Sequence, residues 1–417
     1  MVEYSVLYME QASPKNLSFD TLGIDKQLLS ILHWQKFTTP TPIQHQCIPA
    51  ALSGQDIVGI AQTGTGKTLA FGVPMIQQLA KNRGQGLVLL PTRELAIQVE
   101  EVLRKIADRL RLRTAVVIGG APMNRQARAL RSNPDIVVAT PGRLNDHIEQ
   151  GTYNPNRVKI VVLDEADRML DIGFAPQIKK ILSFCTPNRQ TLLFSATMPP
   201  EIAGLASRYM RTPLRIEVAP SGTTVIKVEQ ELYIVSKDQK MQLLEKILFD
   251  TQGSVLVFSR TKRGAKKITA GICAFGITAV EIHSNRSMAQ RKMAMEGFKS
   301  RRFRVLVATD IAARGIDVSD IALVINFDLP DASEDYVHRI GRTGRAGNTG
   351  KAISFVAPEE RGDIKHIERL IRKTLPIIAL PKLPPRRVQP KFIPDHNQWR
   401  ENRPRNNFRK RNFKKRY

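Results

Sequence analysis

Cysteine is scarce in this sequence, with three residues in a chain of 417: Cys47, Cys185 and Cys273. Thiols so few and so far apart form neither a disulfide framework nor a cluster with metal-ligand spacing, which indicates a reducing compartment. Long apolar runs are also missing, so we expect no membrane span. The first residues, MVEYSVLYMEQASPK, contain Glu3 and lack the apolar core of a secretory signal. We therefore expect a cytoplasmic protein with no membrane partner.

Acidic residues are the other shortage: 38 Asp and Glu stand against 64 Lys and Arg, which leaves a net charge of +26. A balance so positive favours a polyanionic partner, most simply nucleic acid, with a membrane surface as the weaker alternative. The remaining composition, 42% hydrophobic and 24% charged, is that of an ordinary globular protein. The length predicts roughly two to three domains.

Residues 61–68, AQTGTGKT, have the form of a phosphate-binding loop (P-loop) between a strand and a helix. Gly64 and Gly66 can adopt backbone angles that point successive N–H groups at one anion, and a helix beginning near Lys67 adds its positive dipole end. We expect Lys67 to reach the β- and γ-phosphates and the Thr68 hydroxyl to bind Mg²⁺. The alternative is a glycine-rich turn that happens to end in Lys-Thr. The predicted nucleotide-binding loop comprises Ala61, Gln62, Thr63, Gly64, Thr65, Gly66, Lys67 and Thr68.

Short apolar runs alternate with amphipathic segments along most of the chain. Each run is continuous rather than polar at every second residue, which is typical of a parallel sheet covered on both faces. After the P-loop strand we expect strands at 86–90, 115–118, 135–139, 159–163 and 190–194. Helical periodicity before the P-loop predicts helices near 19–32 and 43–52. The fold class is therefore α/β.

The pattern lapses around 211–227 and then resumes, with expected strands at 231–235, 254–258, 278–282, 304–308, 322–327 and 352–356. This second half repeats the α/β plan but has no second Gly-Lys-Thr, so we expect a single nucleotide site. The expected organisation is a lead-in at 1–16, a first domain at 17–212, a linker at 213–227, a second domain at 228–376 and a disordered basic tail at 377–417.

A buried-strand pattern at 161–163 ends in Asp164-Glu165-Ala166-Asp167. After such a strand, Asp164 is expected to hold Mg²⁺ through water, and Glu165 to orient and deprotonate an attacking water. The alternative is a solvated acidic turn. Arg342 and Arg345 in the second half could supply positive charge to the γ-phosphate across a cleft between the domains. Their alternative is a basic surface helix.

Over residues of about 17 to 376 the chain resembles the DEAD-box ATP-dependent RNA helicases, whose name the tetrapeptide at 164–167 spells. The resemblance rests on short motifs in the family's order, in addition to the P-loop: PTRELA at 91–96, GG at 119–120, TPGR at 140–143, SAT at 195–197, VFSR at 257–260, ATDIAARGID at 308–317 and HRIGRTGR at 338–345. It implies two tandem RecA-like domains. The short basic tail adds a likeness to the bacterial RhlE-type branch.

The resemblance also implies roles for single residues. Gln44 would read adenine and Phe19 would pack on the base, so the nucleotide would be ATP, while Asp317 would touch the ribose. Residues implied to couple hydrolysis to strand separation are Asp167, Ser195, Thr197 and His338. The residues implied to bind RNA, mostly at phosphate or sugar, are Arg93, Gly120, Thr140, Arg143, Arg260, Arg291, Thr309 and Gly315.

Simpler roles remain open for some of these residues. Ser195 and Thr197 could cap a helix that begins near Pro199, and the glycine pair at 119–120 could be a simple turn. The chain departs from the family pattern at Ala61, at Lys36-Phe37 and at 283–288, where the last departure puts only the detailed RNA contact of Arg291 in doubt.

The expected function is RNA-stimulated ATP hydrolysis coupled to local, non-processive unwinding of short duplexes or remodelling of RNA–protein complexes. Residues 382–417 hold 13 basic and two acidic residues with interleaved aromatics, which predicts an RNA-binding tail with little sequence preference. The alternatives are an ATP-gated RNA clamp and an annealer driven by the tail. We expect a monomer that binds RNA, with ribosome-assembly or RNA-decay proteins as further candidate partners.

Overall fold

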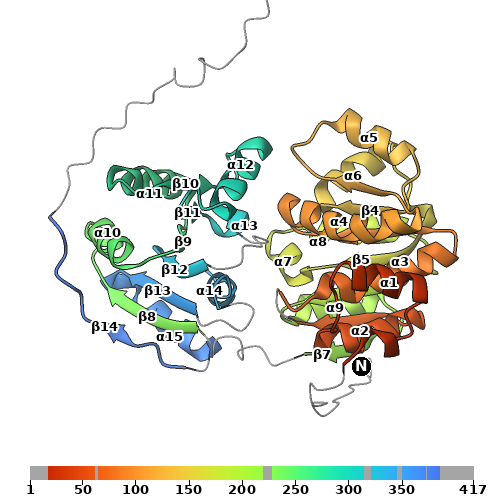
Figure 1. Ribbon diagram of the computed structural model, residues 1–417, viewed down its shortest axis with the longest axis horizontal. Coiled ribbons are helices and arrows are strands. Elements are labelled where there is room, and N and C mark those ends of the chain that lie inside the picture. Colours follow the sequence, from red (N-terminus) through yellow and green to blue (C-terminus); the bar gives the residue numbers. More distant parts are fainter. Residues whose placement is uncertain are drawn as a thin grey trace, which may run out of the picture.

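The computed structural model describes residues 17–61, 64–218, 228–313, 321–344, 350–371 and 373–385. The expected lead-in, part of the expected linker and the tail beyond 385 lie outside these residues. So do five expected site residues: Gln62, Thr63, Gly315, Asp317 and Arg345. The described chain forms two domains that lie side by side (Figure 1).

The first domain is built on a seven-stranded sheet in which all neighbouring strands are parallel. The strands lie in the order β3, β4, β2, β5, β6, β1, β7. Every residue of β1 and β2 is buried, as continuous apolar runs predict for strands covered on both faces. The bounds are Ile57–Ile60 (β1), Gln85–Leu89 (β2), Thr114–Val117 (β3), Ile136–Ala139 (β4), Val158–Leu163 (β5), Gln190–Ser195 (β6) and Leu214–Glu217 (β7).

Helices cover both faces of this sheet and enclose two apolar cores, one around Phe71 and Phe194 and the other around Met169. The helices are α1 (Lys26–Trp34), α2 (Pro42–Leu52), α3 (Lys67–Lys81), α4 (Arg93–Ala107), α5 (Met123–Arg131), α6 (Pro141–Glu149), α7 (Ala166–Asp171), α8 (Ala175–Phe184) and α9 (Pro200–Tyr209). Short 3₁₀ turns occupy Phe19–Thr21, Asp108–Leu110 and Pro155–Arg157.

The second domain has its own seven-stranded parallel sheet, in the order β10, β11, β9, β12, β13, β8, β14. Its strands are Val228–Ile234 (β8), Ser254–Phe258 (β9), Ala279–Ile282 (β10), Val305–Ala308 (β11), Ile321–Asn326 (β12), Gly350–Val356 (β13) and Ile377–Ile378 (β14). Its helices are α10 (Lys240–Asp250), α11 (Lys262–Ala274), α12 (Met288–Lys299), α13 (Asp310–Ala313), α14 (Ser333–Ile340) and α15 (Arg361–Ile371), with a 3₁₀ turn at Pro358–Glu360. The described chain therefore consists of two tandem α/β domains, each built on a parallel sheet.

Two short edge strands extend the domains beyond their expected boundaries. β7 lies inside the expected linker at 213–227, yet it pairs with β1 along its whole length. β14 lies inside the expected tail at 377–417 and pairs with β8. Both strands are short and partly exposed, so neither carries the continuous apolar run that reveals the inner strands.

Within the described residues, no helix has both the length and the apolar character needed to cross a bilayer. The thiols of Cys47 and Cys185 are buried, and burial raises the pKa of each, that of Cys185 to about 11. Cys273, on α11, is exposed. All three cysteines are free thiols.

Candidate nucleotide site and nucleic-acid interface

The P-loop joins β1 to α3 at the carboxyl edge of the first sheet. Gly66 precedes α3 with a φ of 90°, a left-handed angle that favours glycine. A Cβ atom at this position would lie 2.3 Å from Nε2 of Gln44 and 3.0 Å from Oγ1 of Thr41. The backbone angle and the lack of space therefore both require glycine.

Gln44, on α2, is buried beside the P-loop. Its Nε2 atom donates to the carbonyl oxygen of Gly66 at 2.9 Å, and its Oε1 atom accepts from the backbone N–H of Thr41 at 2.9 Å. The amide thus links the P-loop to the start of α2. Phe19, expected to pack on a base, is fully buried in the apolar core, so the structure does not place its ring at an open surface.

Lys67 and Asp164 meet at the P-loop from two elements. Lys67 begins α3, and its Nζ atom donates to the carbonyl oxygen of Ala61 at 3.0 Å and lies 3.8 Å from Oδ1 of Asp164, which follows β5. Burial raises the pKa of Asp164 to about 6, although the ammonium group of Lys67 opposes the shift. Thr68 is half-buried on the first turn of α3. An ammonium group, a carboxylate and a hydroxyl therefore lie at this edge of the sheet.

Glu165 stands between β5 and α7 with a φ of 52°, an uncommon angle for a residue with a side chain. Its carboxylate forms an ion pair with Arg168, and both side chains are buried. Burial alone would raise the pKa of Glu165, but Arg168, Lys67 and Arg342 together hold it below its usual range. Arg342 belongs to the second domain, so cations of both domains act on this carboxylate.

Asp167, on α7, anchors the loop that follows β6. Its Oδ2 atom accepts from the backbone N–H groups of Ala196 and Thr197 and from the Thr197 hydroxyl at 2.9 to 3.0 Å. Its own N–H donates to Oγ of Ser195 at 3.2 Å. The N-cap of α9 is Pro199. The alternative in which Ser195 and Thr197 merely cap that helix is therefore wrong.

Arg93 begins α4 and lies over the turn at Gly119 and Gly120. A Cβ atom on Gly120 would lie 2.2 Å from Nη1 of Arg93, and Gly120 has a φ of 79°. The glycine pair is thus more than a simple turn, because it makes room for the guanidinium group. Arg143, on α6, approaches the same loop and donates from Nη1 to the carbonyl oxygen of Ala121 at 2.9 Å.

Three other residues expected to bind RNA lie near the carboxyl ends of strands. Thr140 follows β4 in the first domain and is buried, and Thr309 follows β11 in the second. Arg260 stands two residues after β9, where its guanidinium group lies 3.2 Å from Oε1 of Glu360 and 3.3 Å from Oδ1 of Asp331. The two carboxylates orient this arginine.

Arg291, on α12, contacts the first domain. Its Nη2 atom lies 2.8 Å from Oε2 of Glu94, and both side chains are largely buried. Met288, one turn earlier, packs against the core of the first domain. In this structure Arg291 therefore joins the two domains. Its contact with RNA remains a prediction, and to make that contact Arg291 would have to leave Glu94.

His338 lies on α14, and Arg342 follows that helix and donates from Nε to the carbonyl oxygen of His338 at 3.2 Å. Arg339, not singled out from the sequence, is the bulkiest fully buried side chain among the described residues. Its guanidinium group donates to Oδ1 of Asp310 and to the carbonyl oxygen of Asp328, each at 2.6 Å. Arg339 thereby holds α14 in place, and with it Arg342.

Two family models match the chain: DEAD/DEAH box helicase over residues 41–205 and helicase conserved C-terminal domain over residues 239–347. The DEAD-box ATP-dependent RNA helicase CshA of Geobacillus kaustophilus is 44% identical over 370 residues, which cover 88% of this chain and 79% of that protein. The chain belongs to the DEAD-box ATP-dependent RNA helicases. The expected enzyme class and the use of ATP are confirmed, and an RNA clamp is not favoured. The DEAD-box ATP-dependent RNA helicase CshA of Bacillus cereus is 45% identical over 370 residues, which cover 88% of this chain and 70% of that protein. These two relatives do not support the narrower likeness to the RhlE-type branch.

Solved structures place this helicase among the RecA-like tandem folds. A variant of S. cerevisiae Dbp5 bound to RNA and ADP BeF3 matches it with a TM-score of 0.80 at 28% identity, covering 87% of this chain and 96% of that one. The same variant bound to Gle1 and IP6 matches with a TM-score of 0.70 at 28% identity, covering 87% and 95%. Over the whole chain this helicase thus matches the RNA-bound form of Dbp5 with a higher TM-score than the Gle1-bound form.

Sequence reasoning about this helicase missed Arg168 and Glu94. Arg168 stands three residues after Glu165, a spacing at which two side chains meet on a helix, so the ion pair could have been predicted. Glu94 offers no such signal, because its partner Arg291 lies in the other domain.

Proposed function

We propose that this helicase couples RNA-stimulated ATP hydrolysis to local, non-processive unwinding of short RNA duplexes or to remodelling of RNA–protein complexes. The observation that carries the proposal is the action of Arg342, from the second domain, on Glu165 in the first. A site completed by both domains hydrolyses ATP rapidly only while the domains are together. RNA that binds the closed arrangement more tightly than the open one therefore stimulates hydrolysis.

ATP is bound at the P-loop, where backbone N–H groups and Lys67 hold the phosphates. Gln44 contacts this loop and carries both donor and acceptor groups, which suits the edge of adenine. Because the same amide also bonds Gly66, recognition of the base is linked to the conformation of the P-loop. The contacts of Phe19 with adenine and of Asp317 with ribose belong to this proposal.

The oxygen donors beside the P-loop fit a magnesium ion. Mg²⁺ in such sites takes one or two protein oxygen ligands, several waters and the phosphates. Thr68 offers a hydroxyl, and Asp164 offers a buried carboxylate that Lys67 only partly neutralises. We assign the ion to these two residues, with Asp164 acting through water. When bound, it neutralises charge on the β- and γ-phosphates.

Glu165 is the residue that orients the attacking water and accepts its proton. Its low pKa keeps it ionised at neutral pH, as a proton acceptor must be. Arg168 holds the carboxylate from within the same turn. Arg342 and Arg345 supply positive charge to the γ-phosphate, a contribution worth about 10³ to 10⁵ in rate when an arginine makes it.

The Asp167 network couples this chemistry to strand separation. Asp167 ties the acidic turn to Ser195 and Thr197, so a change beside the γ-phosphate reaches the loop after β6. His338 connects the second domain to the same region. RNA contacts, mainly to phosphate and sugar, are proposed for Arg93, Gly120, Thr140, Arg143, Arg260, Arg291, Thr309 and Gly315.

We also propose that the protein is a cytoplasmic monomer whose basic tail binds RNA. The three free thiols and the excess of basic residues support this assignment. Proteins of ribosome assembly or RNA decay are the further partners we propose.

Steady-state ATP turnover tests the proposal. We would measure it with no nucleic acid, with single-stranded RNA and with DNA of the same sequence. RNA alone should stimulate turnover, and Glu165→Gln should abolish the stimulated rate while ATP binding persists. Equal rates under all three conditions would show that RNA does not act through domain closure, and the proposal would fail.

A further inference from the structure

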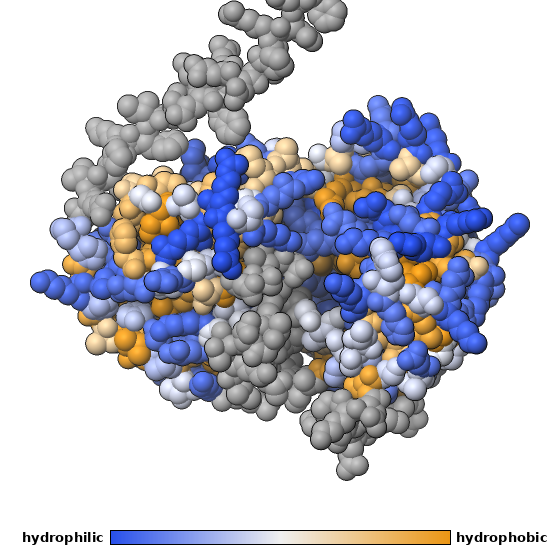
Figure 2. Space-filling view, viewed as in Figure 1, coloured by the Kyte–Doolittle hydropathy of each residue, from blue (hydrophilic) through white to orange (hydrophobic). Residues whose placement is uncertain are grey.

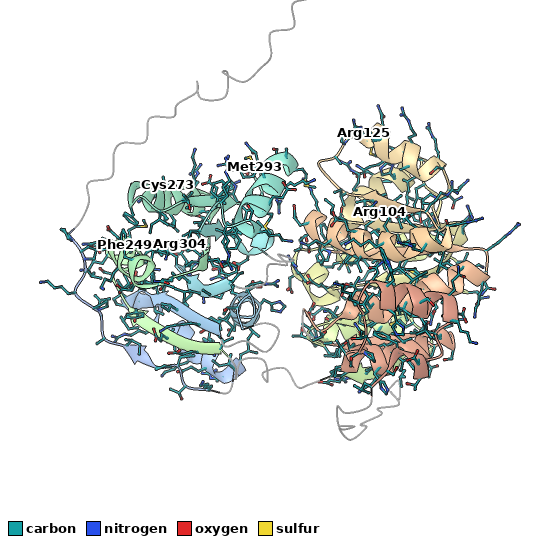
Figure 3. The ribbon with its side chains drawn as sticks, in the orientation of Figure 1. Arg104, Arg125, Phe249, Cys273, Met293 and Arg304 are labelled. Atoms are coloured by element: carbon teal, nitrogen blue, oxygen red, sulfur yellow. The ribbon has the colours of Figure 1, made fainter. Side chains whose placement is uncertain are left out.

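The outward face of α5 carries three exposed arginines, Arg125, Arg128 and Arg131, spaced three residues apart. The helix contains no acidic residue. Within the described part of the chain, none of the three guanidinium groups takes part in an ion pair. Hydrophilic side chains crowd the upper end of the first domain in Figure 2, where Figure 1 places α5, and Figure 3 shows Arg125 at that end. We call this surface the arginine face of α5.

The arginine face of α5 has a fixed position relative to the loop at 118–121. Gln126, on the buried side of the helix, donates to the carbonyl oxygens of Ile118 and Ala121 at 3.1 and 3.2 Å. Its Oε1 atom accepts from the backbone N–H of Ile118 at 2.8 Å. This loop is also the one that Arg93 covers and to which Arg143 donates. Gln126 therefore anchors α5 to the loop that also contacts Arg93 and Arg143, two residues to which we assign RNA phosphates.

Exposed cations on a helix are often no more than solvated surface. The second domain shows that ordinary pattern at α15, where Lys365 and Arg369 alternate with Asp363 and Glu368. On α5 the charges have one sign and a spacing at which like charges on a helix repel each other. Because α5 has no acidic residue to offset the repulsion between its arginines, its exposed face is suited to bind a polyanion.

We propose that the arginine face of α5 binds phosphates of the RNA duplex that flanks the strand held by the helicase. This inference rests on the proposed function, because it adds a contact to the same substrate. Surfaces that bind single strands combine cations with aromatic rings on which bases stack. The outward face of α5 offers Asn124 and arginines but no ring. It suits a duplex, which keeps its bases inside and presents a regular backbone.

The test compares the full chain with two triple variants. R125Q/R128Q/R131Q removes the arginine face of α5 and replaces it with residues that favour helix. K365Q/R369Q/K373Q is the matched control, because it removes three exposed cations from α15 and the residues after it, far from α5 (Figure 1). Affinity is measured over a range of salt for a single-stranded RNA and for the same strand adjoining a duplex.

The native chain should bind the duplex-flanked RNA more tightly than the single strand. The α5 variant should lose this extra affinity, by about tenfold or more at 0.1 M salt, and its slope of log affinity against log salt should flatten by up to about three. Its affinity for the single strand, its ATP turnover with that strand and its unfolding midpoint should match the native values. The α15 variant should match the native chain on both RNAs.

Three results would overturn the inference. Equal losses on both RNAs would mean that the arginine face binds single strands, and no loss on either would mean that it is solvated surface. Equal losses in the two triple variants would indicate a general effect of net charge. Failure of the proposed function is a separate result, because it is seen in the native chain as a lack of stimulation by single-stranded RNA.

Discussion

Each domain has its own sheet with the same strand order, and each places a lysine beside an aspartate at the equivalent position. Counted from the first strand of each domain, the strand order is 3, 4, 2, 5, 6, 1, 7 in both. In both, the helix after the first strand begins with a lysine, and an aspartate follows the fifth strand. Lys67 lies 3.8 Å from Asp164, and Lys240 lies 3.4 Å from Asp328. The scaffold alone therefore does not explain why nucleotide chemistry is assigned to the first domain.

The difference between the domains lies in the residues just before each lysine. Gly64 and Gly66 have positive φ angles, whereas Gln239, before Lys240, has ordinary right-handed angles. Without such glycines the backbone cannot turn successive N–H groups toward one anion. The ammonium group of Lys240 instead donates to the carbonyl oxygen of Phe327 at 2.8 Å. The same lysine position is thus assigned to a ligand in the first domain, whereas in the second it packs within the domain.

The largest effect is expected from substitution of Arg342, the second-domain residue whose charge acts on Glu165 in the first domain. Arg342→Gln should lower RNA-stimulated turnover by about 10³-fold or more, because it removes positive charge from the γ-phosphate. ATP affinity should change little, since the P-loop remains intact. Turnover within tenfold of the native rate would show that the first domain hydrolyses ATP without this arginine.

Replacing the two lysines should separate their roles. Lys240→Met should lower the free energy of unfolding of the second domain by about 3 kcal/mol, because it leaves the carboxylate of Asp328 without its buried partner. Hydrogen exchange of peptides from each domain would localise the loss, and ATP affinity should persist.

Lys67→Met is the matched variant in the first domain. It should abolish ATP binding, because the P-loop loses the ammonium group expected to reach the phosphates, whereas Lys240→Met should leave ATP affinity intact. If both variants instead lost stability alike and bound ATP alike, the contrast between the two lysines would be wrong.

A smaller effect is expected at Arg168, which holds Glu165 and has no counterpart in the predicted site. Arg168→Gln should lower the turnover number about tenfold, because the carboxylate of Glu165 is then free to leave its position. The concentration of ATP at half-maximal rate should be unchanged. Arg168→Lys should recover part of the rate, and an equal loss in both variants would argue against an ion-pair role.

The smallest expected effect is on the pH dependence of the stability of the first domain. His147 is fully buried on α6, with Nδ1 2.7 Å from Oγ1 of Thr152, and burial lowers its pKa. Because the unfolded chain binds the proton more tightly, His147 contributes stability that is complete above about pH 6.5 and is lost as the pH falls. His147→Gln should therefore flatten the pH dependence of first-domain unfolding below about pH 6.5. An unchanged slope would assign that dependence to other groups.

The sequence predicted those parts of the fold and site whose signals are local. The strand at 254–258 was predicted to the residue, because the continuous apolar run at 255–258 makes up most of it. The P-loop was also predictable, since its glycines and lysine are adjacent in the chain. Edge strands β7 and β14 were missed because they are partly exposed. The pairing of Arg291 with Glu94 and the second lysine–aspartate pair were missed because their partners come together only in the folded chain.

One of the three thiols is exposed and two are buried, so the native chain can be labelled with a fluorophore at a single cysteine. Cys273 is exposed on α11 in the second domain (Figure 3), whereas Cys47 and Cys185 are buried in the cores of the first. A thiol-reactive dye should therefore label one known atom without prior removal of any cysteine. With a second fluorophore attached to the first domain, energy transfer from that atom would follow domain closure in real time, one ATP turnover after another.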